Sequence, residues 1–308
     1  MTPELSVVTT VYRSESYLNR FIDSCLESIE KLGIQSFELI FVLDGITDQS
    51  KELLVKRKAQ TPEIVIVEFS RNFGHHYAIT AGLEQSTGKD VFLIDCDLEV
   101  MPSLVERFYE EKHKTGADVV YGIQAQRKGS WVKAYLGSWF WKVFNFFSQT
   151  HVPENVMTER LMSQEYVRKL VSLGDRNLFL GGMMYWVGYH QVGIVVEKSS
   201  RKKSTYSFFH RLNLMFQAIS SFSPKPLYFL FYLGLIISML SLSFMTFLFV
   251  KKILFPETIL SGFTTLAALL LFSTGVVILS LGIVGLYLSK IFTQTQNRPL
   301  YIIKTIIK

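Results

Sequence analysis

Residues 91–98 read VFLIDCDL, an apolar run that ends in two aspartates separated by one residue. Val91–Ile94 has the length and the apolar character of a buried β-strand. Asp95 and Asp97 would then follow at the carboxyl end of that strand. The segment predicts an apolar strand inside a sheet, with carboxylates placed at the edge of the sheet.

Strand-like and helix-like runs alternate on both sides of this segment. The strand-like runs are Leu5–Val11, Phe37–Leu43, Ile64–Phe69 and Asp118–Tyr121, and the helix-like runs are Ser16–Lys31, Gln49–Ala59, His75–Gln85 and Pro102–Lys114. This alternation predicts an α/β fold, with a mostly parallel sheet covered by helices on both faces. Ligands bind such sheets beyond the carboxyl ends of the strands. Asp44 follows the second strand, so we expect Asp44, Asp95 and Asp97 at one rim.

Asp95 and Asp97 form a D-x-D pair that can hold a divalent cation. Carboxylate oxygens suit Mg²⁺ or Mn²⁺, and such a cation can bridge a diphosphate and neutralise its charge. The alternative is a pair of aspartates that cap a turn. Cys96 should face away from its two neighbours and pack in the core. The only other cysteine is Cys25, so the sequence has no disulfide framework and fits a reducing compartment.

The segment from Ser70 to His76 reads SRNFGHH and lies at the start of a predicted helix. Arg71 and the amino terminus of that helix could receive phosphate oxygens. The alternative is an ordinary loop with a solvated arginine. His75 and His76 fit hydrogen-bonding groups better than metal ligands, because no third ligand has suitable spacing.

The second half of the sequence contains two long uncharged runs, Leu227–Val250 and Thr258–Ser289, separated by a short polar break. Hydrophobic residues make up 49% of the chain and aromatic residues 14%, which is high for a purely soluble enzyme. Leu227–Val250 would be about 36 Å long as a helix, enough to cross a bilayer with some tilt. Because two such runs occur in tandem, we predict a hairpin of two transmembrane helices rather than a buried pair.

Basic segments flank the uncharged runs, and the formal net charge is +6. Residues 199–226 contain no acid and five cations, and residues 290–308 also contain cations and no acid. These flanks outnumber Lys251 and Lys252, so the positive-inside rule places the N-terminal domain and the tail in the cytoplasm. We interpret both flanks as membrane-facing; a solvated basic face is the alternative. No nucleic-acid motif accompanies the charge, so no nucleic-acid partner is expected. The N-terminal residues do not resemble a signal peptide.

Residues 131–148 are rich in Trp, Tyr and Phe and contain no acid. Trp and Tyr favour the headgroup level of a membrane, so we predict an interfacial helix here. A core helix could have the same composition and remains the alternative.

Eight segments along the chain form a recognisable set of motifs. They are LSVVTTVY at Leu5–Tyr12, FELIFVLDGITD at Phe37–Asp48, FSRNFGHHYAITAG at Phe69–Gly82, VFLIDCDL at Val91–Leu98, RLM at Arg160–Met162, STY at Ser204–Tyr206, SFSPKPL at Ser221–Leu227 and NRPLYI at Asn297–Ile302. Together they resemble glycosyltransferase family 2, and more narrowly its polyprenyl-phosphate glycosyltransferases. They are similar to dolichol-phosphate mannose synthases and to bacterial undecaprenyl-phosphate glucosyltransferases. The resemblance therefore covers nearly the whole chain.

The resemblance implies a hexosyltransferase of GT-A fold that inverts the anomeric centre. The donor would be a nucleotide-sugar, with UDP favoured, and the acceptor a polyprenyl phosphate, with undecaprenyl phosphate favoured. Nucleotide contacts are implied for Thr9, Tyr12, Asp44, Arg71 and Asp95, metal contacts for Asp95 and Asp97, and acceptor-phosphate contacts for Arg160, Arg201 and Lys202.

The implied organisation divides the chain into segments. Residues 1–198 would be a cytoplasmic catalytic domain, residues 199–226 a basic interfacial segment, 227–250 and 258–289 the transmembrane helices, and 290–308 a cytoplasmic tail. We therefore expect a multi-pass protein of the cell membrane, and we also expect a homo-oligomer.

The sequence departs from the family pattern at two sites. Leu43 replaces the first Asp of the usual Asp-Asp-Gly, and Thr158 occupies the position of an Asp that the family uses as catalytic base. Glu159, the next residue, is an alternative base. A processive synthase is disfavoured because the sequence lacks Q-x-x-R-W. Two alternatives remain: transfer to a non-lipid acceptor, and a degenerate domain that serves as a scaffold. The presence of Asp95 and Asp97 argues against a scaffold.

Overall fold

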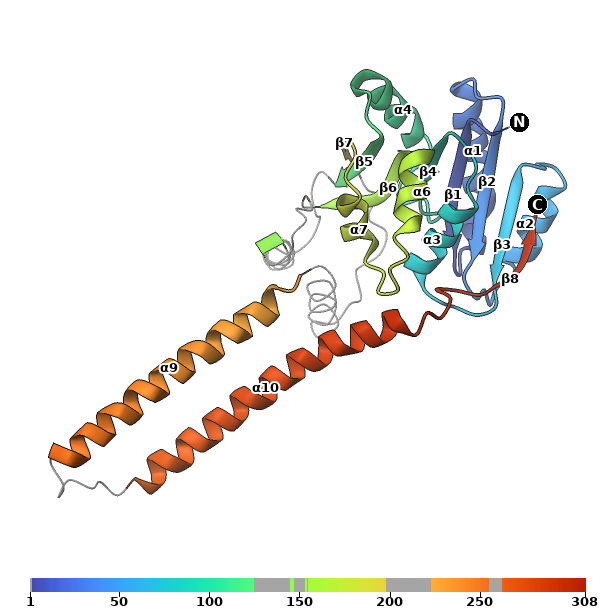
Figure 1. Cartoon of the computed structure of the whole chain (residues 1–308). Coiled ribbons are helices and arrows are strands. Elements are labelled where there is room, and N and C mark those ends of the chain that lie inside the picture. Colours follow the sequence, from blue (N-terminus) through green and yellow to red (C-terminus); the bar gives the residue numbers. More distant parts are fainter. Residues whose placement is uncertain (1, 125–144, 147–152, 154, 198–222, 255–261) are drawn as a thin grey trace.

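The computed structural model describes residues 2–124, 145–146, 153, 155–197, 223–254 and 262–308. The predicted interfacial helix at 131–148 lies almost entirely outside the described residues, and so does most of the basic segment 199–226, including Arg201 and Lys202. The described residues form an α/β unit from which two long helices project (Figure 1).

A mixed sheet of eight strands forms the centre of the α/β unit, in the order β7-β5-β6-β4-β1-β2-β3-β8. The strands are β1 (Leu5–Val11), β2 (Phe37–Leu43), β3 (Ile64–Phe69), β4 (Asp90–Leu93), β5 (Val119–Gln124), β6 (Val156–Ser163), β7 (Gln191–Val196) and β8 (Ile303–Ile307). Strands β3, β2, β1 and β4 run parallel in succession, and β7 is parallel to β5. By contrast, β6 is antiparallel to both β4 and β5, and β8 is antiparallel to β3. The predicted α/β class is confirmed. The prediction of a mostly parallel sheet is wrong at β6 and β8, which are antiparallel to their neighbours.

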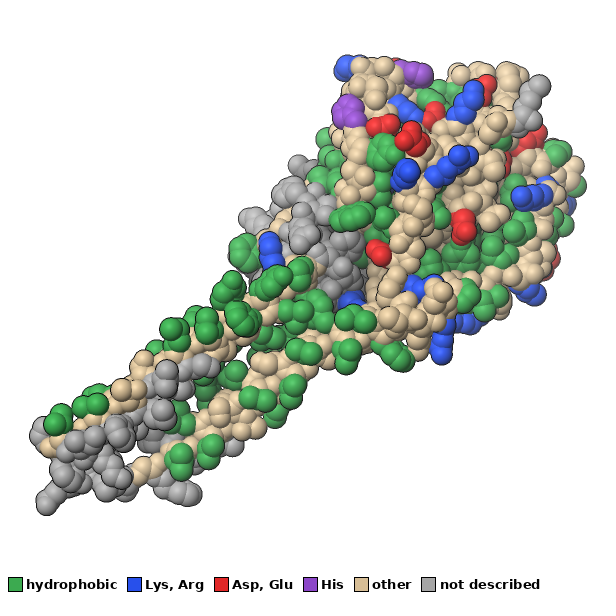
Figure 2. Space-filling model, viewed as in Figure 1, with side chains coloured by type: hydrophobic (Ala, Val, Ile, Leu, Met, Phe, Trp, Pro, Cys, Tyr) green, Lys and Arg blue, Asp and Glu red, His purple; other side chains and the backbone are tan. Residues whose placement is uncertain are grey.

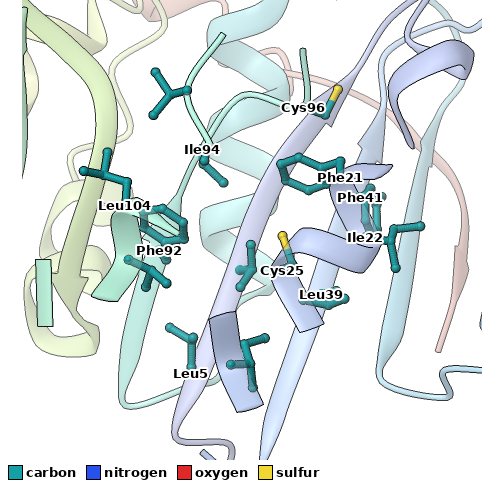
Figure 3. Packing of buried hydrophobic residues seen from close by; sticks show 14 of the residues in the cluster. Leu5, Phe21, Ile22, Cys25, Leu39, Phe41, Phe92, Ile94, Cys96 and Leu104 are labelled. Carbon is teal, nitrogen blue, oxygen red and sulfur yellow. The ribbon is translucent and has the colours of Figure 1, made fainter. Parts of the chain in front are cut away.

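Helices cover both faces of the sheet, as predicted. The first face carries α1 (Glu15–Lys31), α2 (Ser50–Lys58) and α4 (Leu104–Thr115), and the second face carries α3 (His75–Gln85), α6 (Gln164–Ser172) and α7 (Leu180–Trp186). Each face has its own buried cluster. On the first face, Phe21 of α1 packs edge-on against Phe41 of β2 with ring centroids 6.1 Å apart, close to Cys25 and Cys96 (Figure 3). Burying each such side chain stabilises the fold by about 1.5–3 kcal/mol.

The second face is held tightly where α3 crosses β1. A Cβ on Gly82 of α3 would lie 2.4 Å from Cγ1 of Val8, so only glycine permits this close approach. The tight packing fixes the position of α3, and with it the start of the helix at His75.

The carboxyl ends of the parallel strands meet at one rim. β1, β2 and β4 end there at Val11, Leu43 and Leu93. Because β6 is antiparallel to its two neighbours, β5 and β7 run in the same direction as β4 and also end at this rim. The last residues of β5 and β7, Gln124 and Val196, therefore lie at the rim that holds the two aspartates.

The two projecting helices are α9 (Lys225–Leu254) and α10 (Phe263–Thr295). Their described side chains are largely apolar and exposed (Figure 2). Phe231 and Phe272, for example, are 64% and 65% exposed. Among the described residues, one segment, Phe272–Thr295, has the length and mean hydropathy, 2.0, of a membrane span. The two-span hairpin therefore stays a prediction.

Residues beyond α10 return to the sheet. The backbone N–H of Ser70 donates to the carbonyl of Ile302 at 3.0 Å, and Tyr301 stacks on Phe69 with ring centroids 5.0 Å apart. The side-chain amide oxygen of Gln294 in α10 accepts from the N–H of Arg176 at 3.0 Å. The segment 290–308, expected to be a basic tail, thus contains the end of α10 and strand β8. Tyr301 and Ile302 thus join the segment after α10 to the carboxyl end of β3, at the rim described above, and Gln294 joins α10 itself to the segment before α7.

Candidate active site

Asp44 holds the loop between β3 and α3. Its carboxylate is 3% exposed and accepts hydrogen bonds from the backbone N–H groups of Phe73, at 2.7 Å, and Gly74, at 3.0 Å. The side-chain amide of Asn72 donates to the backbone carbonyl of Asp44 at 3.1 Å. The residue predicted to lie near the nucleotide is thus at the rim, and its carboxylate orders the neighbouring loop.

Gly45 allows the loop to come this close. Its φ angle is +63°, and a Cβ at this position would lie 2.1 Å from the backbone nitrogen of Asn72. A side chain would therefore clash with the backbone of the loop, in addition to the strain of the left-handed conformation. The pair Asp44-Gly45 is needed to hold the loop that begins α3.

His75 is the first residue of α3 and lies between β1 and β4. Its Nδ1 is 3.1 Å from Oγ1 of Thr10, and its Nε2 is 3.6 Å from Oδ1 of Asp95. Desolvation lowers the pKa of His75, while the charges of Asp44 and Asp97 act in the opposite direction. The prediction of a hydrogen-bonding role is confirmed by Thr10. The contact with Asp95 was not predicted, because it depends on how α3 packs and leaves no local pattern in the sequence.

The two aspartates of the D-x-D pair are half-buried at the end of β4. Oδ1 of Asp97 accepts from the N–H of Glu99 at 2.9 Å, and Leu98 between them has a φ of +57°. Asp97 therefore also caps a turn, which was the alternative reading. Cys96 points to the core, where its Sγ donates to the carbonyl of Thr10 at 3.1 Å, and burial raises its pKa to about 11. The prediction that Cys96 packs in the core is confirmed.

The donor set at this rim is compatible with a divalent cation that is shared with a substrate. Within the described residues, His, Cys, Asp and Glu side chains form no cluster of three or more that could enclose a metal ion. Mg²⁺ is commonly bound by one or two carboxylates, with the remaining positions filled by substrate phosphates and water. Asp95 and Asp97 fit this pattern, because two carboxylates are sufficient when a diphosphate supplies further oxygens.

The other residues assigned to the nucleotide lie at different depths. Thr9 is buried below the rim, whereas Tyr12, just beyond β1, is 45% exposed. Arg71 is exposed; its guanidinium lies 4.0 Å from the centre of the Phe73 ring and donates to the carbonyl of Asn72 at 3.0 Å. Tyr12 and Arg71 are accessible to a ligand at the rim, whereas Thr9 is buried within β1.

Arg160 lies in β6, paired in register with Leu93 of β4 and Tyr121 of β5. It is only 2% exposed, and its Nε and Nη2 donate to the carbonyls of Thr158 and Met157, each at 3.1 Å. Its buried Nη1 has no hydrogen-bond partner among the residues that the structure describes. The arginine predicted to bind the acceptor phosphate is therefore tied to its own strand.

Thr158 and Glu159 face opposite sides of β6, because the segment is extended. The described pairing of β4 with β6 ends at Leu93 and Arg160, so Thr158 lies beyond the last pair, two residues from Arg160 along β6. Glu159 is 1% exposed and is on the face of the sheet that carries Leu161 and the first core cluster. Thr158, at the position of the family's base, is thus on the same face of β6 as Arg160, and Glu159 is on the opposite face.

A cavity of about 600 Å³ opens beside the Asp97 turn. Residues 98–101 form one wall, α4 contributes Arg107, α1 contributes Arg20, and the end of β7 contributes Val196 and Glu197. The cavity lies on the first face of the sheet, on the other side from His75. The turn that carries Asp97 therefore has open space next to it.

Comparison with known proteins matches residues 6–171 to glycosyl transferase family 2. A protein of Mycobacterium tuberculosis described as a putative glycosyltransferase is 37% identical over 302 residues, covering 98% of this chain and 88% of that protein. The bactoprenol glucosyl transferase of Shigella phage SfX is 31% identical over 309 residues, covering 98% of this chain and 99% of that protein. A solved mannosyltransferase of Pyrobaculum calidifontis, with GDP-mannose and Mn²⁺, shares 16% identity and a TM-score of 0.49, covering 73% of this chain and 67% of that one.

The family match spans β1 to α6, the part of the chain that builds the rim with Asp44, Asp95 and Asp97. The resemblance seen in the sequence motifs is thereby confirmed. The chain belongs to glycosyl transferase family 2 and is a glycosyltransferase.

Proposed function

We propose that the chain transfers a sugar from a nucleotide-sugar, a UDP-sugar by preference, to a polyprenyl phosphate such as undecaprenyl phosphate, with inversion at the anomeric carbon. One observation carries the proposal. The family match ends at residue 171, whereas the similarity to bactoprenol glucosyl transferase covers 98% of this chain. The shared part therefore includes α9 and α10, whose exposed apolar side chains suit a lipid environment.

The connection of the helices to the sheet supports a lipid acceptor. α10 leads into β8 at the carboxyl end of β3, and β5 and β7 end at the same rim. A phosphate at the membrane surface would thus be close to the edge that holds the D-x-D pair. We propose a catalytic domain on the cytoplasmic side of the cell membrane, with α9 and α10 as a two-span hairpin.

Residues at the rim have distinct roles in this proposal. Tyr12 and Arg71 contact the nucleotide, Asp44 keeps the loop of residues 72–74 in place, and Asp95 and Asp97 hold Mg²⁺ or Mn²⁺ with the diphosphate. When bound, the cation neutralises the charge of the nucleoside diphosphate as it leaves. Arg160, whose buried Nη1 has no hydrogen-bond partner among the described residues, and the basic residues Arg201 and Lys202 are proposed for the acceptor phosphate.

The acceptor can explain Thr158 at the position of the family's base. An alcohol loses a proton as it attacks, and an enzyme normally supplies a base for it. A phosphate monoester has a second pKa of about 6, so near neutral pH it already carries an anionic oxygen. Positioning then supplies most of the rate. Since Glu159 faces the opposite side of β6 from Thr158, we propose that no protein carboxylate takes the acceptor's proton.

Purified protein tests the proposal directly. A panel of radiolabelled nucleotide-sugars, incubated with undecaprenyl phosphate and Mg²⁺ or Mn²⁺, should give one glycolipid that separates from the free sugar on thin-layer plates. Asp97→Asn should keep the fold and lose most of the transfer, and a chelator should have the same effect on the unsubstituted protein. Transfer by Asp97→Asn at the normal rate with chelator present would overturn the metal assignment, and failure of every donor with the lipid would overturn the acceptor.

A further inference from the structure

His75 is the residue at the rim whose position the proposed reaction leaves unexplained. It bridges Thr10 of β1 and Asp95 after β4, with its two ring nitrogens 3.1 Å and 3.6 Å from their side-chain oxygens. The ring thus lies between two parallel strands at the point where one of them delivers a carboxylate.

The chemistry of the two partners decides which nitrogen carries the proton. Nε2 lies 3.6 Å from Oδ1 of Asp95, longer than a hydrogen bond, and an ionised carboxylate can only accept, so the tautomer that favours this contact carries its proton on Nε2. Nδ1 is then left as an acceptor, and the hydroxyl of Thr10, which can donate, lies within hydrogen-bond distance of it. The hydroxyl of Thr10 therefore fixes the orientation of the imidazole through Nδ1, the ring nitrogen on the side away from Asp95. Hydrogen-bonding groups around a metal site orient the metal's ligands in the same way.

The backbone that carries His75 is fixed independently of the ring. Gly74, with a φ of +112°, precedes it, and the Asp44 carboxylate binds the N–H groups of Phe73 and Gly74. Gly82 seats the same helix against β1. Because the backbone of His75 is held in this way, its imidazole can restrict the movement of the Asp95 side chain.

We propose that His75 is a positioning residue that holds the Asp95 carboxylate in the orientation that receives the metal–nucleotide complex. The inference rests on the proposed function, because it takes Asp95 as part of the metal and diphosphate site. His75 does not ligate the metal; it restricts the rotation of Asp95 through Nε2. Loss of such an outer partner typically weakens metal affinity by about 10- to 100-fold.

His76 provides a matched control. It is the next residue in the same helical turn, its ring centroid is 6.1 Å from that of His75, and its Nδ1 lies 3.4 Å from the carbonyl of Leu178. It therefore faces the segment before α7 and not Asp95. His76→Ala removes an imidazole of the same size from the same helix end without removing the contact to Asp95.

The test measures binding and not turnover. Mn²⁺ is titrated into the full-length protein in detergent, with saturating UDP, and free Mn²⁺ is followed by electron paramagnetic resonance. His75→Ala should weaken Mn²⁺ binding by about 10-fold or more, as for other outer partners, whereas His76→Ala should change it less than about twofold. His75→Gln, whose side-chain amide can still donate toward Asp95, should recover part of the affinity.

The outcomes separate this inference from the proposal beneath it. If Asp97→Asn abolishes binding while His75→Ala binds Mn²⁺ as tightly as the unsubstituted protein, the positioning role is wrong and the metal site stands. Equal losses in His75→Ala and His76→Ala would show a general effect on the start of α3 and would also overturn the inference. If Asp97→Asn binds Mn²⁺ normally, or the unsubstituted protein with UDP does not bind it, the metal site itself is wrong.

Discussion

Substitution of Asp44 by asparagine should destabilise the catalytic domain by disrupting the loop before α3. The buried carboxylate accepts from the N–H groups of Phe73 and Gly74, at 2.7 and 3.0 Å. Asparagine keeps one acceptor oxygen and turns its amide NH₂ toward the other donor. A hydrogen bond to a charged group is worth about 1.5–3 kcal/mol, so we expect Asp44→Asn to lower the free energy of unfolding by about 2 kcal/mol.

Thermal unfolding followed by intrinsic fluorescence measures this loss. For a domain of this size, 1 kcal/mol shifts Tm by about 2–4 °C, so Asp44→Asn should lower Tm by about 4–8 °C. Asp48→Asn is the matched control: Oδ1 of Asp48 accepts one bond from the N–H of Ser50 at 3.2 Å, and the side chain is half-buried. Its Tm should fall by less than half as much.

UDP binding, measured well below the unfolding temperature, separates two roles for Asp44. If the carboxylate orders the loop, Asp44→Asn lowers both Tm and UDP affinity. If Asp44→Asn leaves Tm within 1 °C of the parent and still loses UDP binding, the carboxylate contacts the nucleotide directly. That result would refute the reasoning that its main partners are the two backbone N–H groups.

Three further predictions test other parts of the structure. Glu159→Gln should keep substantial transfer at neutral pH, and activity should fall on acidification through the acceptor's second pKa of about 6, because protonation removes the attacking anion; a loss of roughly a thousandfold with folding intact would identify Glu159 as the base. Cysteines introduced at Glu257 and Lys308 should react with impermeant reagents from opposite sides of the membrane, and reaction from one side would exclude the two-span hairpin. Cys25 and Cys96 are buried, and burial raises the pKa of both thiols; mass spectrometry should find both alkylated only after denaturation, and rapid alkylation in the native state would contradict the core packing.

Local sequence patterns predicted the first half of the sheet well. The apolar runs of β1 to β4 are bounded by turn residues, and their packing on both faces makes them uniformly apolar, so each could be recognised alone. The aspartates at the rim followed from the same strands, because parallel strands end on one side.

β6 and β8 could not be recognised in this way. β6 includes the charged residues Glu159 and Arg160, which are buried, so the strand has no continuous apolar run in the sequence. A long segment separates β6 from its partners β4 and β5, so no local pattern indicates the pairing. β8 belongs to a segment whose charge suggested a surface tail, and its partner β3 lies more than two hundred residues earlier. The contact between His75 and Asp95 was missed for the same reason, since only the packing of α3 on β1 brings the two residues together.

The position of β8 in the chain has a consequence for biosynthesis. β3 is synthesised early, but its partner β8 leaves the ribosome only after both α9 and α10. Until then β3 is an open edge, and unpaired edges of apolar strands invite association with other chains. Ile66 and Val67 pair with β2 on one side, and they gain their second partner, β8, only once both helices have left the ribosome. A nascent chain stalled within α10 would therefore present a nearly complete catalytic sheet with an unprotected edge, a form that quality-control proteases and chaperones could distinguish from the finished protein.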